Sequence, residues 1–366
     1  MPFPGAWVYA RWGRARQRLS SHFFPPPGTF SHLRLLSLVC RNSGQTKNNH
    51  NMKIQSLITH RSTRGFAALC LAALLGTVAA TCADEYQTRV VTSGLHRPTG
   101  IAIRGSSTIY FTEIPTPGVG GGLNAVKELN LRTSQITTLH QGEPEPTNIA
   151  LGRDGDIYWT CKSAGVILKQ DDDGVTTRFL GGLTKPSGIS VDRDDHVYFT
   201  LLPTPGVSGA KGGTNSVNVS DGTTTTVLHS GEPEPTDIVV AKDGDIYWTC
   251  KTAGVILHQN AATGVTDRLA GGLNKPVGIA LDHKDRNLYF TEVPTPGVSG
   301  KNGGSNKVWE INLKTGAKSL VHSGDPEPTD VTVAKNGDVY WTCSSAGVIV
   351  EASRPPRKDD DDDDRK

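Results

Sequence analysis

Residues 234–270 read EPTDIVVAKDGDIYWTCKTAGVILHQNAATGVTDRLA and contain four short β-prone runs separated by turn residues. The runs are Glu234–Val240, Ile246–Cys250, Val255–Gln259 and Val265–Ala270. Aspartate and glycine between the first two runs favour a tight turn. Four short runs joined by turns predict a four-stranded antiparallel sheet of the kind that forms one blade of a β-propeller.

The same pattern recurs along the chain. A proline two residues before a glycine, asparagine or aspartate precedes an aromatic pair six times, every 40–52 residues. The six prolines are Pro98, Pro146, Pro186, Pro235, Pro276 and Pro328. Longer signatures recur three times, with PTPGV at Pro115, Pro203 and Pro294. A repeat of this length predicts an all-β, six-bladed propeller built from three tandem two-blade repeats.

The last blade ends before a fourth strand, because a charged tail follows Val348–Val350. The segment TRVVTSGL at 88–95 matches TRFLGGL at 177–183 and DRLAGGL at 267–273, which are expected fourth strands. We therefore expect the N-terminal strand to complete the last blade and close the ring.

Particular residues also resemble known propellers. PTGIA at Pro98–Ala102, PVGIA at Pro276–Ala280 and DGDIYWT at Asp243–Thr249 resemble the NHL and YWTD type of six-bladed propeller. They are also similar to the virginiamycin B lyase and gluconolactonase-like families, over about residues 86–352. The resemblance implies the fold and, in those enzyme families, a divalent-metal-dependent lyase or lactonase activity. Because folds host many functions, it does not select one activity.

The two ends of the chain differ from the repeats. Residues 1–83 hold ten basic residues and no acidic one, and the uncharged stretch Phe66–Ala80 follows Arg64. This predicts an N-terminal extension with a secretory signal from about Met52; a transit peptide to an organelle is the alternative. The apolar stretch is too short for a membrane span. Residues 354–366 contain six consecutive aspartates and predict a disordered tail.

Removal of residues 1–83 leaves the propeller at 84–353 and its tail with 28 basic and 36 acidic residues. That balance argues against nucleic acid as a partner, because phosphate binding needs a basic surface. We also expect no membrane span in the mature chain and a monomeric protein.

Acidic residues recur where each even blade begins, in GEPEPT or GDPEPT segments. These candidate ligand-binding residues are Glu143, Glu145, Glu232, Glu234, Asp325 and Glu327. Loops on one face of a rigid scaffold commonly carry binding residues, so we expect an acidic site at the channel mouth. Odd blades carry Arg97, Lys185 and Lys275 before the proline, so the alternative is a structural ring of salt bridges between adjacent blades.

Two residues after the even-blade prolines stand Asn148, Asp237 and Asp330, where odd blades have glycine. Oxygen ligands near a channel axis could hold Ca²⁺ or Mg²⁺. In the gluconolactonase-like relatives the metal carboxylates directly follow the proline. This chain instead has Thr99, Thr147, Ser187, Thr236, Val277 and Thr329 there, a departure that weakens the implied metal chemistry.

Histidine and cysteine also recur. His140, His229 and His322 each precede an acidic segment and are candidate general bases, unless they simply bond their own turns. Cys161, Cys250 and Cys343 fall once in each even blade, on second strands, too far apart for a disulfide or a shared zinc site. We expect three buried free thiols.

Three functions follow from these features. The first is a secreted binding module that takes a small-molecule ligand, a sugar or a peptide at its acidic face. The second is a lyase or lactonase that uses histidine, glutamate and a divalent ion at the same mouth. The third is a structural extracellular propeller without a pocket.

Overall fold

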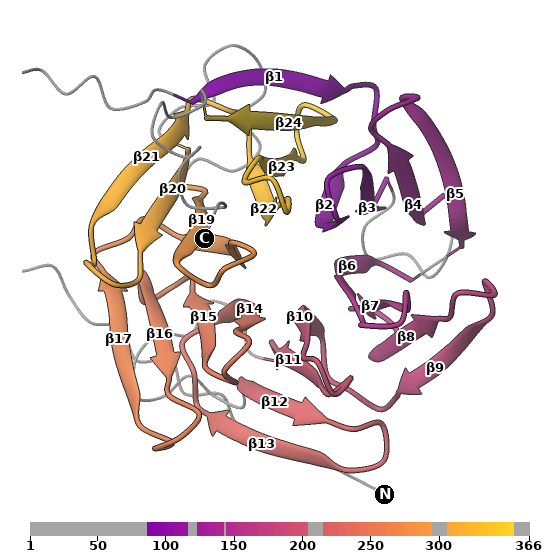
Figure 1. Ribbon diagram of the computed structural model, residues 1–366. Helices are drawn as coiled ribbons and strands as arrows, with labels where there is room; N and C mark the ends of the chain where they lie inside the picture. The colour runs from indigo at the N-terminus through magenta and orange to yellow at the C-terminus, as the bar shows by residue number, and fades with distance from the viewer. Residues whose placement is uncertain (1–85, 116–122, 143, 204–214, 295–305, 355–366) are drawn as a thin grey trace, which may run out of the picture. The chain divides into compact units, whose positions relative to one another are not determined.

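The computed structural model describes residues 86–115, 123–142, 144–203, 215–294 and 306–354. Over these ranges the chain forms strands and turns, and no helix occurs among them. The strands form six four-stranded antiparallel sheets that are arranged in a ring as the blades of a propeller (Figure 1). The predicted N-terminal extension, the PTPGV loops beyond their first residues and the acidic tail lie outside the described ranges.

The blades are named A to F in chain order. Blade A contains β2 (Pro98–Arg104), β3 (Thr108–Glu113), β4 (Ala125–Asn130) and β5 (Gln135–Gln141). Blade B contains β6 (Pro146–Leu151), β7 (Ile157–Cys161), β8 (Val166–Gln170) and β9 (Thr176–Leu180). Blade C contains β10 (Pro186–Val191), β11 (Val197–Leu201), β12 (Ser216–Ser220) and β13 (Thr225–Ser230).

The second half repeats this order. Blade D contains β14 (Pro235–Val240), β15 (Ile246–Cys250), β16 (Val255–Gln259) and β17 (Thr266–Gly271). Blade E contains β18 (Pro276–Leu281), β19 (Asn287–Glu292), β20 (Lys307–Asn312) and β21 (Lys318–Ser323). Blade F contains β22 (Pro328–Val333), β23 (Val339–Cys343), β24 (Val348–Ser353) and β1 (Gln87–Thr92).

The strands of blade D match the expected runs to within one residue. The inner strand begins at Pro235 and not at Glu234, because Glu234 has a left-handed backbone with φ of 56°. The residue before every blade proline shares this conformation, with φ between 51° and 59°. A left-handed residue turns the chain sharply, so each inner strand begins with its proline.

The N-terminal strand β1 pairs with β24, and Gln87 lies opposite Ser353. It occupies the outer position of blade F, as β9 does in blade B and β17 in blade D (Figure 1). How far this strand stabilises the closed ring stays a prediction.

Within the described ranges the core consists of six apolar clusters, each shared by two neighbouring blades. The aromatic pair on each second strand explains this arrangement, because successive side chains on a strand point to opposite faces. Trp159 of blade B packs toward blade A, and its neighbour Tyr158 packs toward blade C. One aromatic pair therefore fills two interfaces between blades.

Candidate functional site

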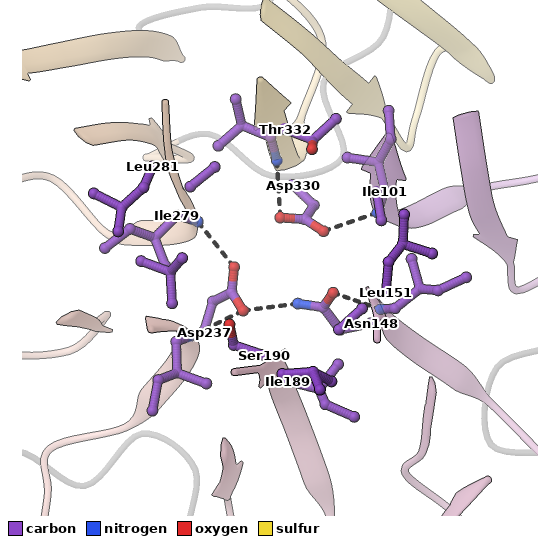
Figure 2. A pocket seen from close by; sticks show the side chains of 18 of the residues that line it. Ile101, Asn148, Leu151, Ile189, Ser190, Asp237, Ile279, Leu281, Asp330 and Thr332 are labelled. Carbon is purple, nitrogen blue, oxygen red and sulfur yellow. Dashed lines mark hydrogen bonds between the residues drawn. The ribbon is translucent and has the colours of Figure 1, made fainter. Parts of the chain in front are cut away.

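Three polar side chains from alternate inner strands meet at the central channel. Asn148, Asp237 and Asp330, the axial set, belong to β6, β14 and β22 and point inward (Figure 2). Their exposed fractions are 8%, 4% and 5%, so all three are buried. Asn148 Nδ2 donates a hydrogen bond to Asp237 Oδ1 at 2.8 Å. The sequence-predicted trio is thus brought together by the fold.

Each carboxylate of the axial set joins two blades. Asp237 accepts the backbone N–H of Ile238 in its own blade and of Ile279 in the next blade, both at 2.8 Å. Asp330 accepts that of Val331 at 2.8 Å and that of Ile101 in blade A at 2.9 Å. A register shift in each inner strand accompanies these inward N–H groups.

Asn148 breaks the threefold pattern. Its single amide oxygen accepts the N–H of Ile149 at 2.6 Å, and its amide nitrogen donates to Asp237. No described side chain accepts the N–H of Ile189, which occupies in blade C the place that Ile279 occupies in blade E, and Figure 2 draws no bond there. An amide cannot serve as acceptor on both sides as a carboxylate does.

Burial makes these carboxyl groups hold protons. Desolvation raises the pKa of Asp237 to about 7, against hydrogen bonds that lower it. Desolvation, followed by the charge of Asp237, raises the pKa of Asp330 well above its usual value. Like charges in one dry site cannot both ionise easily, so the pair holds at least one proton at neutral pH.

The axial set divides the channel into two cavities. A cavity of about 120 Å³ lies on the side where the inner strands begin, and one of about 210 Å³ lies beyond the axial set. The smaller cavity is lined by a hydroxyl ring, which consists of Thr99, Thr147, Ser187, Thr236 and Thr329. Val277 takes the sixth position.

Hydroxyl hydrogens of this ring are directed at backbone carbonyls. Ser187 Oγ donates to the carbonyl oxygen of Thr236 at 2.9 Å, and Thr329 Oγ1 donates to that of Pro98 at 3.3 Å. Once the hydrogen is used, the oxygen presents only lone pairs. The small cavity is therefore rich in hydrogen-bond acceptors.

A second ring of threonines supports this site and was not predicted from the sequence. Thr160 Oγ1 accepts the N–H of Asn148 at 3.1 Å and donates to the carbonyl oxygen of Ser187 in the next blade at 2.7 Å. The second-strand threonines are all fully buried: Thr112, Thr160, Thr200, Thr249, Thr291 and Thr342. The signal was available, since threonine follows the aromatic pair in all six blades.

The axial set does not fit a divalent cation as it stands. Each oxygen of Asp237 and Asp330 already accepts a backbone N–H, and Asn148 directs its N–H group at Asp237. Within the described ranges no three His, Cys, Asp or Glu residues are grouped so as to hold a metal ion. Binding of Ca²⁺ or Mg²⁺ by this protein stays a prediction.

The glutamates before the even-blade prolines bond within their own blades. Glu145 accepts a hydrogen bond from Ser163, and Glu327 accepts one from Ser345. Glu234 accepts one from Thr252 and lies 3.7 Å from Lys251 Nζ. Among the described residues, no ion pair joins one of these glutamates to Arg97, Lys185 or Lys275 of an adjacent blade.

The expected salt bridges between blades are therefore wrong. The physical reason is local. The backbone at these positions is left-handed, and each glutamate contacts the turn between the second and third strands of its own blade. The backbone closes the same contact, since Lys251 N donates to the carbonyl oxygen of Glu234 at 3.0 Å.

Glu232 and Asp325 lie in separate clusters with histidine and tryptophan. Glu232 Oε2 accepts from Trp248 Nε1 at 3.2 Å, and its other oxygen lies 3.9 Å from His229 Nδ1. Asp325 similarly accepts from Trp341 Nε1 at 2.5 Å and lies 3.2 Å from His322. His140 packs against Trp159 with ring centroids 5.8 Å apart, and Glu143 lies outside the described residues.

In these clusters a histidine on an outer strand lies beside a tryptophan on the second strand of the next blade. The three histidines sit on the outer strands β5, β13 and β21, whereas the axial set sits on inner strands. The tryptophans are fully buried, so they offer no open surface to a ligand. The structure thus does not unite the candidate bases with the axial carboxylates.

The three described cysteines, Cys161, Cys250 and Cys343, are buried and form no disulfide with one another, as expected. Cys250 Sγ donates to Glu232 Oε2 at 3.7 Å. Burial, and then the charge of Glu232, raises the pKa of the Cys250 thiol, and burial raises the pKa of Cys343 in the same way. Thiols of this kind pack as small apolar groups.

In the described ranges we find no helix that could cross a membrane. No family model and no curated protein matches the chain.

Solved structures nevertheless share its fold. A streptogramin B lyase structure is 18% identical, with 74% of this chain and 98% of that chain covered at a TM-score of 0.53. A catalytically inactive virginiamycin B lyase from Staphylococcus aureus with quinupristin is 17% identical. The match covers 75% of this chain and 90% of that chain, at a TM-score of 0.50. A gluconolactonase from Xanthomonas campestris is 16% identical. That match covers 72% of this chain and 89% of that chain, at a TM-score of 0.47. The chain is a six-bladed β-propeller, a fold that it shares with the streptogramin B lyase and virginiamycin B lyase structures.

Proposed function

We propose that this protein is a ligand-binding propeller whose site is the small cavity at the end of the channel where the inner strands begin. The observation that carries the proposal is the hydroxyl ring above a buried, proton-holding pair of carboxyl groups. A concave site with a few convergent polar groups is the usual form of a small-molecule site.

The chemistry of the cavity favours a donor-rich ligand group. Its oxygens accept hydrogen bonds, and its carboxyl pair can lose a proton to balance an incoming positive charge. A volume of about 120 Å³ corresponds to roughly four water molecules. The site therefore suits a terminal ammonium group or the hydroxyl groups of a sugar or polyol, inserted from a larger small molecule or peptide.

The matched test uses the ring itself. Calorimetric titration with alkylammonium ions, polyols and short peptides should give binding to the wild type and weaker binding to Asp237→Asn/Asp330→Asn. Thr236→Val should also weaken binding, and valine is sterically acceptable because Val277 already holds the equivalent place. Equal binding by all three proteins would reject the channel site.

We also propose that the propeller acts outside the cell after removal of residues 1–83. The support is the basic, acid-free leader with its short apolar stretch. N-terminal sequencing of the secreted protein should give a start near Asp84. An intact leader on the functional protein would contradict this part of the proposal.

A lyase or lactonase activity is the second candidate, because the fold covers 98% of a streptogramin B lyase chain. Assays with streptogramin B and with sugar lactones, each with and without Ca²⁺ or Mg²⁺, would reveal it. Product formation lost in Asp237→Asn/Asp330→Asn would favour the enzyme. Binding without turnover under all conditions would favour the binding module.

A further inference from the structure

His258 on β16 lies between two carboxylates from different parts of blade D. Its Nε2 is 2.8 Å from Asp245 Oδ2, and its Nδ1 is 3.1 Å from Asp267 Oδ1. The imidazole also stacks on Tyr247, with ring centroids 4.7 Å apart and an interplanar angle of 16°. Asp245 precedes β15 and Asp267 belongs to β17, so one ring connects the second, third and fourth strands.

The chemistry of imidazole decides the charge that this geometry needs. A neutral imidazole has one N–H donor, and its other nitrogen presents a lone pair. It can therefore donate to one carboxylate only, and its lone pair repels the second. Both contacts of His258 are attractive only when both ring nitrogens carry a proton.

Blade B supplies an internal comparison. Lys169 occupies on β8 the place of His258 on β16, opposite the aromatic residue of its second strand. Its Nζ lies 2.5 Å from Asp156 Oδ2 and 5.5 Å from the centre of the Tyr158 ring. Lysine keeps its charge throughout the physiological range, whereas histidine can lose it. Blade D therefore has a titratable group where blade B has a permanent cation.

Other charged groups around the imidazole are mostly acidic. Burial opposes ionisation of Asp245, but the Ala261 N–H and the His258 imidazole hold the pKa of Asp245 below its usual value. Burial and four nearby carboxylates raise the pKa of Tyr247 to about 12, so it stays neutral. Those carboxylates are Asp245, Asp243, Asp285 and Asp267. The nearby cation Lys242 directs its Nζ at the carbonyl oxygen of His283.

We propose that His258 is a pH-dependent latch for β17, the outer strand of blade D. As an imidazolium it ties Asp267 to Asp245, and when it loses its proton it releases Asp267. Asp267 is the side free to leave, because its side chain is 68% exposed whereas that of Asp245 is 14% exposed. When the imidazole is neutral, β17 therefore loses its side-chain connection through His258 to Asp245.

Hydrogen exchange of the folded full chain at pH 5.5 and pH 8, corrected for intrinsic exchange rates, tests the latch. The protection of β17 should fall roughly two- to fivefold at the higher pH relative to β9, the range expected for a partly exposed ion pair. His258→Lys, which copies blade B, should abolish this difference. His258→Gln should show the low protection at both pH values.

Two results would overturn the proposal. One is the same relative fall for β17 in the wild type and in His258→Lys, which would assign it to other groups. The other is a neutral imidazole signal from His258 in the folded protein at pH 5.5, read by histidine-selective NMR with His258→Gln as the assignment control. Both readouts compare sites within one folded protein, so a change in global stability does not imitate the latch.

Discussion

Leu95, which follows β1, donates its backbone N–H to the carbonyl oxygen of Gly347, which precedes β24, at 2.9 Å. The same bond joins Leu183 to Gly165 in blade B at 2.8 Å and Leu273 to Gly254 in blade D at 2.9 Å. In those blades both partners belong to one continuous segment. The N-terminal segment thus takes, next to β24, the place that a fourth strand takes elsewhere.

Deletion of residues 84–94 should therefore destroy the cooperative melting of the propeller. The deletion removes β1 and exposes the edge of β24, including the apolar Val350 opposite Val90. Differential scanning calorimetry should show a broad, much lower transition, while deletion of 355–366 serves as the control of similar length. An unchanged melting temperature would show that β1 is dispensable.

Much of this fold could be predicted from the sequence because the repeat is strong in pattern. The proline, the aromatic pair and the turn glycines placed the strands of blade D to within one residue. The side-chain directions could not be predicted in the same way. Glu234 has a left-handed backbone and bonds to its own blade. A glutamate in a sequence gives no indication that its backbone is left-handed.

The candidate site was predicted only in part for a related reason. Asn148, Asp237 and Asp330 share a sequence position and therefore a distance from the axis, so their meeting could be expected. His229 and His322 lie at the ends of outer strands, and sequence spacing does not give that radial position. Two residues after the blade prolines, glycine in odd blades alternates with Asn or Asp in even blades. The steric reason for this alternation is visible only in the distances between neighbouring blades.

Gly188→Ala should destabilise the propeller by about 2–4 kcal/mol, because core overpacking against backbone cannot relax easily. A Cβ atom at 188 would lie 2.4 Å from Asp237 Cα in the next blade. The control is Gly264→Ala, where φ is +67° but no atom lies within 4 Å, so only backbone strain of about 1 kcal/mol applies. Urea unfolding measures both, and equal losses would contradict the close-packing explanation.

The three described cysteines should resist thiol reagents in the native protein at pH 8. Burial raises the pKa of Cys250 and Cys343, and the thiolate is the reactive form. Reaction with Ellman's reagent should be slow in buffer and should reach three thiols in denaturant for a chain that begins after residue 83. Fast native labelling, or a disulfide among these residues, would contradict the buried placement.

The axial carboxyl pair should make the propeller less stable as pH rises. Both groups have a higher pKa in the folded state than in the unfolded state, so the folded state binds more protons. The stability that this pair contributes is then greatest below the unfolded value of 3.8 and falls as pH rises toward about 7, by on the order of a few kcal/mol.

Asp237→Asn/Asp330→Asn isolates this effect, because an amide cannot ionise. The double variant should lose the part of the pH slope between pH 4 and pH 7 that the pair contributes, although an amide leaves one inward N–H of each site without its acceptor. Urea unfolding at several pH values measures the slope, and His258→Lys in the same background removes the separate contribution of the latch. If the double variant keeps the whole wild-type slope between pH 4 and pH 7, the axial pair is ionised in the folded protein, and the proton-holding site of the proposed ligand cavity is wrong.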